Sequence, residues 1–379
     1  MSEILVRPVK TRKERRIFLN FPWQIYQNDP LWVPPLMPDM QERIDRKRGV
    51  FFKRGEADFF IAWRDGEPVG TICAAEDRQS NAERGDRECM FGFFNFVEDY
   101  AVMEALLGRV RDWAHSRDLH SLTGPYNLDY EDSYGILVEG RDRPPVLMCG
   151  HTPPYYLDFV ERYGFVPGRP GDNIAYQTDL QVPEDDPRLQ RLARIVKALE
   201  RRGHVTARPA RMAEWNSELD YALRILNKGL AVLADFSPWD RGAFAAHAEA
   251  LRAIMDPDLV IFGLVDDEPV GWALGLPNLN EAVQKADGLR HLWDYPRLWW
   301  YARRRPDCVS FKSIAVDPDH WSRGVDAVMV YALVQAARAK GYRWMDLSLT
   351  STDNPMTPLL AERMGAELYR RYRVYRRAL

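Results

Sequence analysis

Long apolar stretches are missing from this sequence. No run reaches the roughly 18 consecutive apolar residues that a membrane-spanning helix needs, so we predict no transmembrane segment. The amino terminus, MSEILVRPVKTRKERR, is rich in charge and has no apolar core, so it does not predict a secretory signal. We therefore expect a cytoplasmic protein.

Cysteine and histidine are scarce. The four cysteines, Cys73, Cys89, Cys149 and Cys308, lie far apart and form no CxxC pair, and the seven histidines show no HExxH or paired spacing. Disulfide frameworks and zinc sites usually show regular, closely spaced ligand patterns. The sequence therefore predicts reduced thiols and no metal.

An excess of positive charge is missing as well. The formal net charge is −3, whereas a dedicated nucleic-acid-binding protein normally carries a basic surplus, so we expect no nucleic-acid partner. What is present is an ordinary globular composition, 46% hydrophobic and 28% charged over 379 residues. A chain of this length is long enough for two hydrophobic cores.

The sequence repeats itself. Residues 60–70, FIAWRDGEPVG, match residues 261–271, IFGLVDDEPVG, at an offset of 201 residues, and the same offset relates RYG at 162–164 to RMG at 363–365. Each copy of the first motif is an apolar run, an acidic turn and a second apolar run, which predicts a β-hairpin. Two matches in one register predict two equivalent units.

Each half reads as hairpin, strand, helix, strand, helix and strand. Apolar residues at helical spacing cover 102–113 in the first half and 325–336 in the second. We predict an α/β fold with mixed sheets, built from an N-terminal unit at 1–180 and a C-terminal unit at 204–379. A linker and helix at 181–203, which begins in the polar stretch QVPEDDPRLQ, joins the two units.

Residues 316–326, VDPDHWSRGVD, open the helix of the second half. Backbone N–H groups at a helix N-terminus converge on an anion, and a glycine lets the backbone approach that anion closely. The pattern favours a phosphate site at the start of this helix.

This order of elements resembles the GNAT fold of acyl-CoA-dependent N-acyltransferases, most closely over 311–365. In that family a strand ends in V-x-P, a loop of pattern Q/R-x-x-G-x-G/A opens a helix, and an asparagine stands eleven residues before a glycine. Val316, Pro318, Gly324 and Asn354 match these positions. The resemblance implies acyl-CoA as co-substrate, bound in the C-terminal unit by Ile314, Ala315, Val316, Arg323, Gly324, Val325 and Asp326.

Two residues of the loop depart from the family pattern. Trp321 replaces Gln or Arg, and Asp326 replaces the last Gly or Ala. A carboxylate repels a pyrophosphate unless it points away, which a residue in the first helical turn can do while it favours the helix dipole. The alternative is that Asp326 caps the helix of a site that no longer binds CoA. In the first half Glu98 and Asp99 replace any RGxG, so we expect no phosphate site there.

The resemblance implies direct attack of an amine on the thioester, with backbone donors on the strand at 311–316 and a side chain that protonates the thiolate. Many members use a tyrosine seven residues after the helix-opening asparagine, but that position is Ala361 here. We predict that the catalytic residues are Tyr372, Tyr375, Asn354 and Ser348. For both tyrosines, ordinary strand packing with a hydrogen-bonded hydroxyl is the alternative.

The chain also resembles a narrower family of bacterial double-GNAT proteins that includes ceramide synthases. The motifs that carry this resemblance are NDPLWVPPL (28–36), RGEADFFIAWRDGEPVG (54–70), FGFF (91–94), GPYNLDYEDSYGILVEG (124–140), PPYY (153–156) and GAELYRRYRVYR (365–376). It implies transfer of a long acyl chain to a lipid amine such as a sphingoid base.

Residues 281–305 have no counterpart in the first half and concentrate Trp and Tyr beside three arginines. Such a segment suits a lid over an apolar substrate or peripheral contact with the inner membrane, and the alternative is a packed helix with a solvated basic end.

Two other functions stay open, a non-catalytic acyl-CoA- or lipid-binding protein and an aminoacyl or peptidyl transferase of GNAT fold. The second would want a basic groove for RNA, which the net charge disfavours. The sequence gives no oligomeric state.

Overall fold

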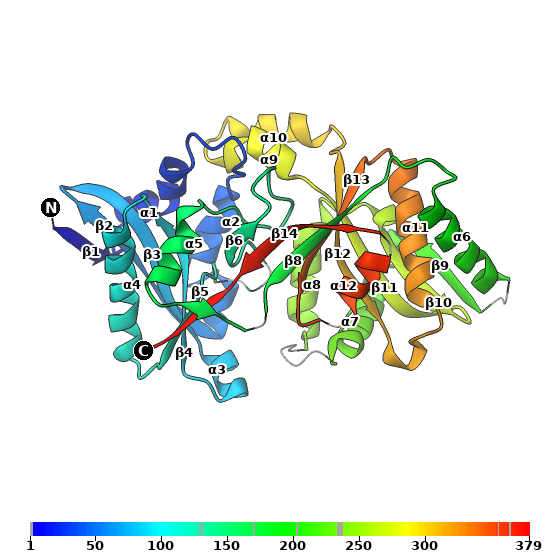
Figure 1. Cartoon of the computed structure of the whole chain (residues 1–379), viewed down its shortest axis with the longest axis horizontal. Coiled ribbons are helices and arrows are strands. Elements are labelled where there is room, and N and C mark those ends of the chain that lie inside the picture. The colour runs from blue at the N-terminus through cyan, green and yellow to red at the C-terminus, as the bar shows by residue number, and fades with distance from the viewer. Residues whose placement is uncertain are drawn as a thin grey trace.

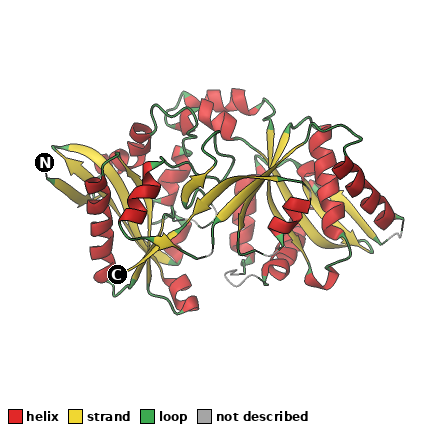
Figure 2. Cartoon of the chain, viewed as in Figure 1, coloured by secondary structure: helices red, strands yellow, loops and turns green. Residues whose placement is uncertain are grey.

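The computed structural model describes residues 3–379 except 129, 131, 170, 202–203, 233–237, 355 and 364. Residue 364, in the second repeated motif, therefore lies outside the described residues. The described chain forms two mixed β-sheets side by side, each covered by helices on both faces (Figure 1, Figure 2). This architecture confirms the predicted mixed-sheet α/β class.

The N-terminal sheet has the strand order β1-β2-β3-β4-β5-β15-β7. Its strands are β1 (Ile4–Pro8), β2 (Gly55–Arg64), β3 (Glu67–Asp77), β4 (Glu88–Phe96), β5 (Ser121–Gly124), β7 (Val166–Pro167) and β15 (Tyr375–Ala378). Its helices are α1 (Arg12–Ile25), α2 (Met37–Arg43), α3 (Arg78–Arg84), α4 (Tyr100–His115) and α5 (Tyr155–Arg162).

The C-terminal sheet has the order β6-β14-β8-β13-β12-β11-β10-β9. Its strands are β6 (Ile136–Glu139), β8 (Asn173–Asp179), β9 (Val205–Pro209), β10 (Val260–Val265), β11 (Glu268–Pro277), β12 (Cys308–Val316), β13 (Trp344–Ser351) and β14 (Glu367–Arg373). Its helices are α6 (Pro187–Glu200), α7 (Trp215–Leu230), α8 (Arg241–Arg252), α9 (Asn280–Lys285), α10 (Asp294–Ala302), α11 (Val325–Ala339) and α12 (Thr357–Arg363).

The two repeated hairpins occupy equivalent places. β2 pairs with β3, and β10 pairs with β11, and each antiparallel pair carries a bulge close to its turn. Asp65 and Asp266, at the first turn positions, both adopt positive φ, 51° and 50°. Aspartate tolerates this left-handed conformation better than most residues. The acidic turn therefore has the same local form in both halves.

Each sheet contains strands from the other half of the sequence: β6 and β8 of the first half lie in the C-terminal sheet, and β15 of the second half lies in the N-terminal sheet. β8 precedes α6 in the chain, yet it lies between β13 and β14 of the C-terminal sheet. β15, the last strand of the chain, lies between β5 and β7 of the N-terminal sheet. Strands of each half therefore complete the sheet of the other half (Figure 1). The boundary at 180–204 divides the chain in sequence order and stays a prediction.

The central helices cover corresponding faces of the two sheets. On α4 the residues Val102, Leu106 and Val110 are fully buried, and α11 buries its own apolar row against the C-terminal sheet. Each such side chain contributes about 1.5–3 kcal/mol when it leaves water. This burial agrees with the helical spacing predicted for 102–113 and 325–336.

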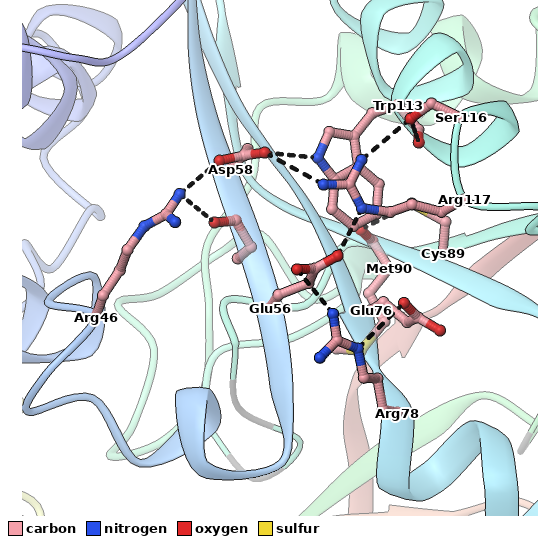
Figure 3. A network of polar contacts seen from close by, with 11 residues as sticks. Arg46, Glu56, Asp58, Glu76, Arg78, Cys89, Met90, Trp113, Ser116 and Arg117 are labelled. Carbon is pink, nitrogen blue, oxygen red and sulfur yellow. Dashed lines mark hydrogen bonds and ion pairs between the residues drawn. The ribbon is translucent and has the colours of Figure 1, made fainter.

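A polar network attaches the end of α4 to the start of β2 (Figure 3). Trp113 Nε1 donates to Asp58 at 2.8 Å, and Arg117 Nε donates to Glu56 at 2.6 Å while its guanidinium lies 3.8 Å from the Trp113 ring centre. The hydrogen bond from Arg117 is the main cause that lowers the pKa of Glu56. The network therefore holds the end of α4 against β2 of the N-terminal sheet.

In the described part of the chain, no helix is both long and apolar enough to cross a membrane.

Candidate functional site

Strands β12 and β13 separate in the middle of the C-terminal sheet. Their parallel pairing runs from Cys308 and Trp344 to Phe311 and Leu347 and then stops. Beyond that point β12 pairs only with β11, and β13 pairs only with β8. The end of β12 at 312–316 therefore has one edge without a partner strand, and backbone groups at such an edge are available to a ligand.

A β-bulge marks the point of separation. Phe311 pairs with Gly275 and Ser313 pairs with Leu274, so Lys312 is the extra residue of the bulge. Bulges change the direction of a side chain and of the strand that follows. The side chain of Lys312 is only 8% exposed, and it lies between the two separating strands.

Five polar side chains meet at this point, which we call the separation cluster: Cys149, Lys312, Asp346, Ser348 and Tyr369. Ser348 Oγ donates to Asp346 at 2.5 Å and accepts from Lys312 Nζ at 2.9 Å. Tyr369 donates its hydroxyl proton to the other oxygen of Asp346 at 2.7 Å.

Burial shapes the electrostatics of the separation cluster. Asp346 is fully buried, and its carboxylate lies 3.5 Å from Lys312 Nζ. Buried charges are stable only when they are paired and hydrogen-bonded, and this pair meets both conditions. Burial raises the pKa of the Cys149 thiol, whose sulfur lies 3.5 Å from Ser348 Oγ. Burial also raises the pKa of Tyr369, so its hydroxyl stays protonated and remains a donor.

The loop between β12 and α11 leaves the helix N-terminus open. Gly324 takes the N-cap position with φ 83°, and no side chain caps the helix. The first N–H groups of a helix have no partner within it, and together with the helix dipole they attract an anion. Arg323 is exposed and Asp326 is half-buried, and the side chain of neither forms an ion pair or hydrogen bond with the residues that the structure describes. Trp321 Nε1 donates to the carbonyl oxygen of Val316 at 3.0 Å, so this departure from the family motif ties the loop to the strand.

The corresponding place in the N-terminal sheet is filled by its own chain. β4 and β5 also stop pairing after Met90 and Thr123, but the next segment returns into the gap. The backbone N–H of Tyr126 donates to the carbonyl of Phe91 at 2.7 Å, and Asn127 Oδ1 accepts from the N–H of Phe93 at 2.8 Å. A ligand strand would find these backbone groups already paired.

The N-terminus of α4 is likewise occupied. Asp99 caps this helix by accepting from the N–H of Ala101 at 2.9 Å, and its carboxylate pairs with Arg64 at 2.5 Å. The protein's own carboxylate therefore stands where an anionic ligand would bind. The contrast with the uncapped α11 supports the prediction of a single phosphate site in the C-terminal half.

The residues that we predicted to bind acyl-CoA lie together in the structure. Ile314, Ala315 and Val316 lie on the separated end of β12, and the loop and first turn of α11 carry Arg323, Gly324, Val325 and Asp326. Val325 is buried against the sheet, so only its backbone can face a ligand. A Cβ on Gly324 would lie 2.5 Å from Leu199 of α6, so that helix packs directly behind the loop.

The predicted catalytic residues are not all brought together. Ser348 belongs to the separation cluster, and Tyr372 packs beside Cys149 with its hydroxyl donating to the carbonyl of Gly150 at 2.9 Å. Asn354 accepts from the N–H of Met356 at 2.9 Å and so caps α12. Tyr375 lies in the N-terminal sheet, where its hydroxyl donates to Glu161, because β15 crosses to that sheet.

Lys312, Tyr369 and Cys149 were not predicted as site residues. Lys312 has a sequence signal, since it is the one charged residue in the apolar strand FKSIAV. Tyr369 and Cys149 have none, because they reach the cluster from β14 and from a loop of the first half. The described residues contain no group of three or more His, Cys, Asp or Glu placed to hold a metal ion.

A groove of about 860 Å³, which none of the five cluster residues lines, lies between α1, the segment 29–34 and the turn after α9. The segment 281–305 contributes Gln284, Lys285, Asp287 and Arg290 to it. The aromatic residues of the same segment face solvent: Trp293, Trp299 and Trp300 are 64%, 57% and 58% exposed. They lie above the junction of the two sheets, on and beside α10 (Figure 1).

Comparisons with known proteins agree with this arrangement. Residues 227–366 match the model of the Acetyltransferase (GNAT) family. The chain is 28% identical over 386 residues to the protein named bacterial ceramide synthase of Caulobacter vibrioides, covering 100% of this chain and 98% of that protein. It is also 28% identical over 388 residues to Protein YghO of Escherichia coli, covering 99% and 95%.

Solved structures share the doubled fold. A tandem GNAT protein from the clavulanic acid biosynthesis pathway superposes with a TM-score of 0.57 at 12% identity, covering 99% of this chain and 98% of that one. A GCN5-related N-acetyltransferase from Sphaerobacter thermophilus gives 0.55 at 12% identity, covering 99% and 95%. These findings confirm the tandem GNAT fold and the resemblance to the bacterial double-GNAT family.

Proposed function

Since the chain is a tandem GNAT-fold protein, we propose that it transfers an acyl group from acyl-CoA to an amine at the separated ends of β12 and β13. One observation carries this proposal. The C-terminal unit has an unpaired strand edge beside an uncapped helix N-terminus. In the N-terminal unit, the backbone of that unit pairs with the equivalent strand edge, and Asp99 caps the equivalent helix.

The donor lies along β12 in this proposal. The amide arm of CoA pairs with the backbone at 313–316 as an added strand would, and the pyrophosphate meets the first turn of α11. Arg323 supplies positive charge from the exposed face of the loop. The thioester then lies at the bulge, beside the separation cluster.

The amine attacks the thioester carbon directly. Backbone N–H groups of β12 stabilise the oxyanion, and the buried ammonium of Lys312 stabilises the negative charge that develops on oxygen and sulfur. Ser348, which Lys312 and Asp346 hold in place, gives a proton to the leaving thiolate.

The acceptor in our proposal is an amphipathic lipid amine such as a sphingoid base, and the donor carries a long acyl chain. Similarity along the whole chain to a protein named bacterial ceramide synthase supports this choice. Each CH₂ group that leaves water contributes about 0.8 kcal/mol, so a long chain gains affinity only where apolar surface receives it.

We also propose that α10 brings the enzyme to the surface of the inner membrane. Trp299 and Trp300 are exposed, and Arg303 and Arg304 lie over their rings. Tryptophan beside arginine is typical of helices that lie in an anionic membrane interface. Co-sedimentation with vesicles of phosphatidylglycerol should fall for Trp299→Ala/Trp300→Ala and stay unchanged for Trp321→Ala, which removes an exposed tryptophan elsewhere.

The test of the acyl transfer is a chain-length series from acetyl-CoA to stearoyl-CoA with sphinganine, with release of the CoA thiol as the readout. We expect turnover that rises with chain length. Equal use of acetyl-CoA would refute the lipid assignment and leave acyl transfer standing, whereas CoA binding without turnover would favour a non-catalytic binding protein.

A further inference from the structure

One segment of the N-terminal half connects the separation cluster to the surface groove. Cys149 Sγ lies 3.5 Å from Ser348 Oγ, and the carbonyl of Gly150 accepts from Tyr372. The next residue, His151, turns its ring toward Asp29, with 2.7 Å between Nε2 and Oδ2. Two residues span at most about 7 Å, so His151 lies within a short reach of the cluster.

The contacts of His151 define its protonation. Its side chain is 5% exposed, and the other oxygen of Asp29 accepts from the N–H of Leu31 at 2.9 Å. A carboxylate accepts hydrogen bonds, so Nε2 of the neutral ring carries the proton and Nδ1 keeps its lone pair. Nδ1 is buried and has no hydrogen-bond partner in the described part of the chain.

An unpartnered buried acceptor is costly and rare, so it points to a ligand or to a proton that arrives during the reaction. The groups around His151 keep it neutral. Burial lowers the pKa of the imidazole, Asp29 opposes that effect, and Arg370 and Arg141 lower it further. The ring of Tyr26 completes the surroundings, 6.2 Å away. A neutral imidazole with a free lone pair is a base.

We propose that His151 Nδ1 accepts the proton of the acceptor ammonium, and that Asp29 is the positioning residue that holds the ring in this tautomer. The assignment rests on the proposed acyl transfer and names its missing base.

The protons balance in this scheme. One N–H bond of the ammonium breaks and an Nδ1–H bond forms. The free amine then attacks the thioester carbon, a C–N bond forms, the C–S bond breaks, and the second proton lost from nitrogen reaches sulfur through Ser348 to give the CoA thiol. Asp29 is 31% exposed and lines the groove, so the proton on His151 can pass to water there.

The first test needs no activity. In the full-length protein labelled with [¹⁵N]histidine, His151→Gln identifies the signal of His151. We expect a neutral ring protonated on Nε2 at pH 7, and a change of tautomer in Asp29→Asn. An imidazolium at pH 7, or a proton on Nδ1, would overturn the proposal.

The second test uses palmitoyl-CoA and sphinganine as probes. General-base catalysis typically contributes about 10²–10⁴-fold, so His151→Gln should lose turnover by that factor at pH 7. The loss should shrink as rising pH deprotonates sphinganine in solution, while the KM for palmitoyl-CoA stays unchanged. Asp29→Asn should lose less and change the pH profile of the rate.

The chain supplies a matched control. His204 Nδ1 lies 2.7 Å from Asp266 Oδ1, but both side chains are mostly exposed, 71% and 68%. His204→Gln should leave turnover and its pH profile unchanged. Full activity of His151→Gln at pH 7 would refute the base role. A wild-type protein without turnover would instead refute the acyl transfer with these probes, and the NMR result then decides the protonation state separately.

Discussion

Asp326→Asn should strengthen CoA binding and weaken the fold at the same time. The carboxylate of Asp326 lies in the first turn of α11, half-buried and without an ion-pair partner among the residues described. Opposite a doubly charged pyrophosphate about 7 Å away, one unit charge costs about 1 kcal/mol in water. Removing it should lower the Kd for CoA about fivefold, because 1.4 kcal/mol corresponds to about tenfold.

Stability should move the other way. An acidic side chain near a helix N-terminus stabilises the helix by about 0.3–1 kcal/mol, so the variant should melt at a slightly lower temperature. Isothermal titration with CoA at two salt concentrations measures the affinity. The gain should fade toward 1 M salt, where the Debye length is about 3 Å.

Asp319→Asn is the control on the same loop. The side chain of Asp319 is 81% exposed and lies 3.9 Å from Lys228. We expect a much smaller change in CoA affinity for this variant. If Asp326→Asn left the Kd for CoA unchanged or raised it at low salt, the pyrophosphate would not lie at the N-terminus of α11, and the donor site inferred here would be wrong.

Three further predictions concern Lys312, Tyr375 and Asp172. Lys312→Met leaves the fully buried Asp346 without its cation, so unfolding in urea should show a loss of about 3–5 kcal/mol, with part of it restored in Lys312→Met/Asp346→Asn. Tyr375→Ala should lower the free energy of unfolding by about 3–5 kcal/mol. Amide hydrogen exchange should rise in β5 and β7 but not in β12, since β15 pairs with β5 and β7 in the N-terminal sheet. A rise confined to β12 would refute the placement of β15 in that sheet. The hydrogen bond from Arg373 is the main cause that lowers the pKa of Asp172. The stability that this pair contributes is therefore complete above the ordinary aspartate pKa of 3.8, and it is lost as the pH falls through the lower pKa of the folded state. Asp172→Asn should remove this part of the acid dependence of the melting temperature.

The hairpins and the α11 loop were predictable because their signals are local. An acidic turn between two apolar runs and a glycine before an apolar helix specify their structures within a few residues. The exchange of β6, β8 and β15 between the sheets was not predictable in this way, because a strand has the same alternating sequence whichever sheet it joins. The boundary predicted at 180–204 therefore divides the chain in sequence order, but it does not divide the strands of one sheet from those of the other.

The separation cluster was predictable only in part. Ser348 was named from its place on the strand after the helix. Tyr369, which donates to the same Asp346, comes from β14, and Cys149 comes from the other half of the sequence. From the sequence alone, Trp299 and Trp300 were equally compatible with a lid over a substrate and with an exposed surface. Their exposure in the folded chain favours the exposed surface. Contacts between distant segments leave no periodic pattern, so chemistry that depends on them appears only in the folded chain.

The most direct test of the central claim is a crystal structure of the full-length protein with CoA. We expect the amide arm of CoA to hydrogen-bond to the backbone of β12 at 313–316, the pyrophosphate to meet the first turn of α11, and the thiol to lie beside Lys312 and Ser348. CoA bound at α4 and β4 of the N-terminal unit, or in the groove beside α1, would contradict the account.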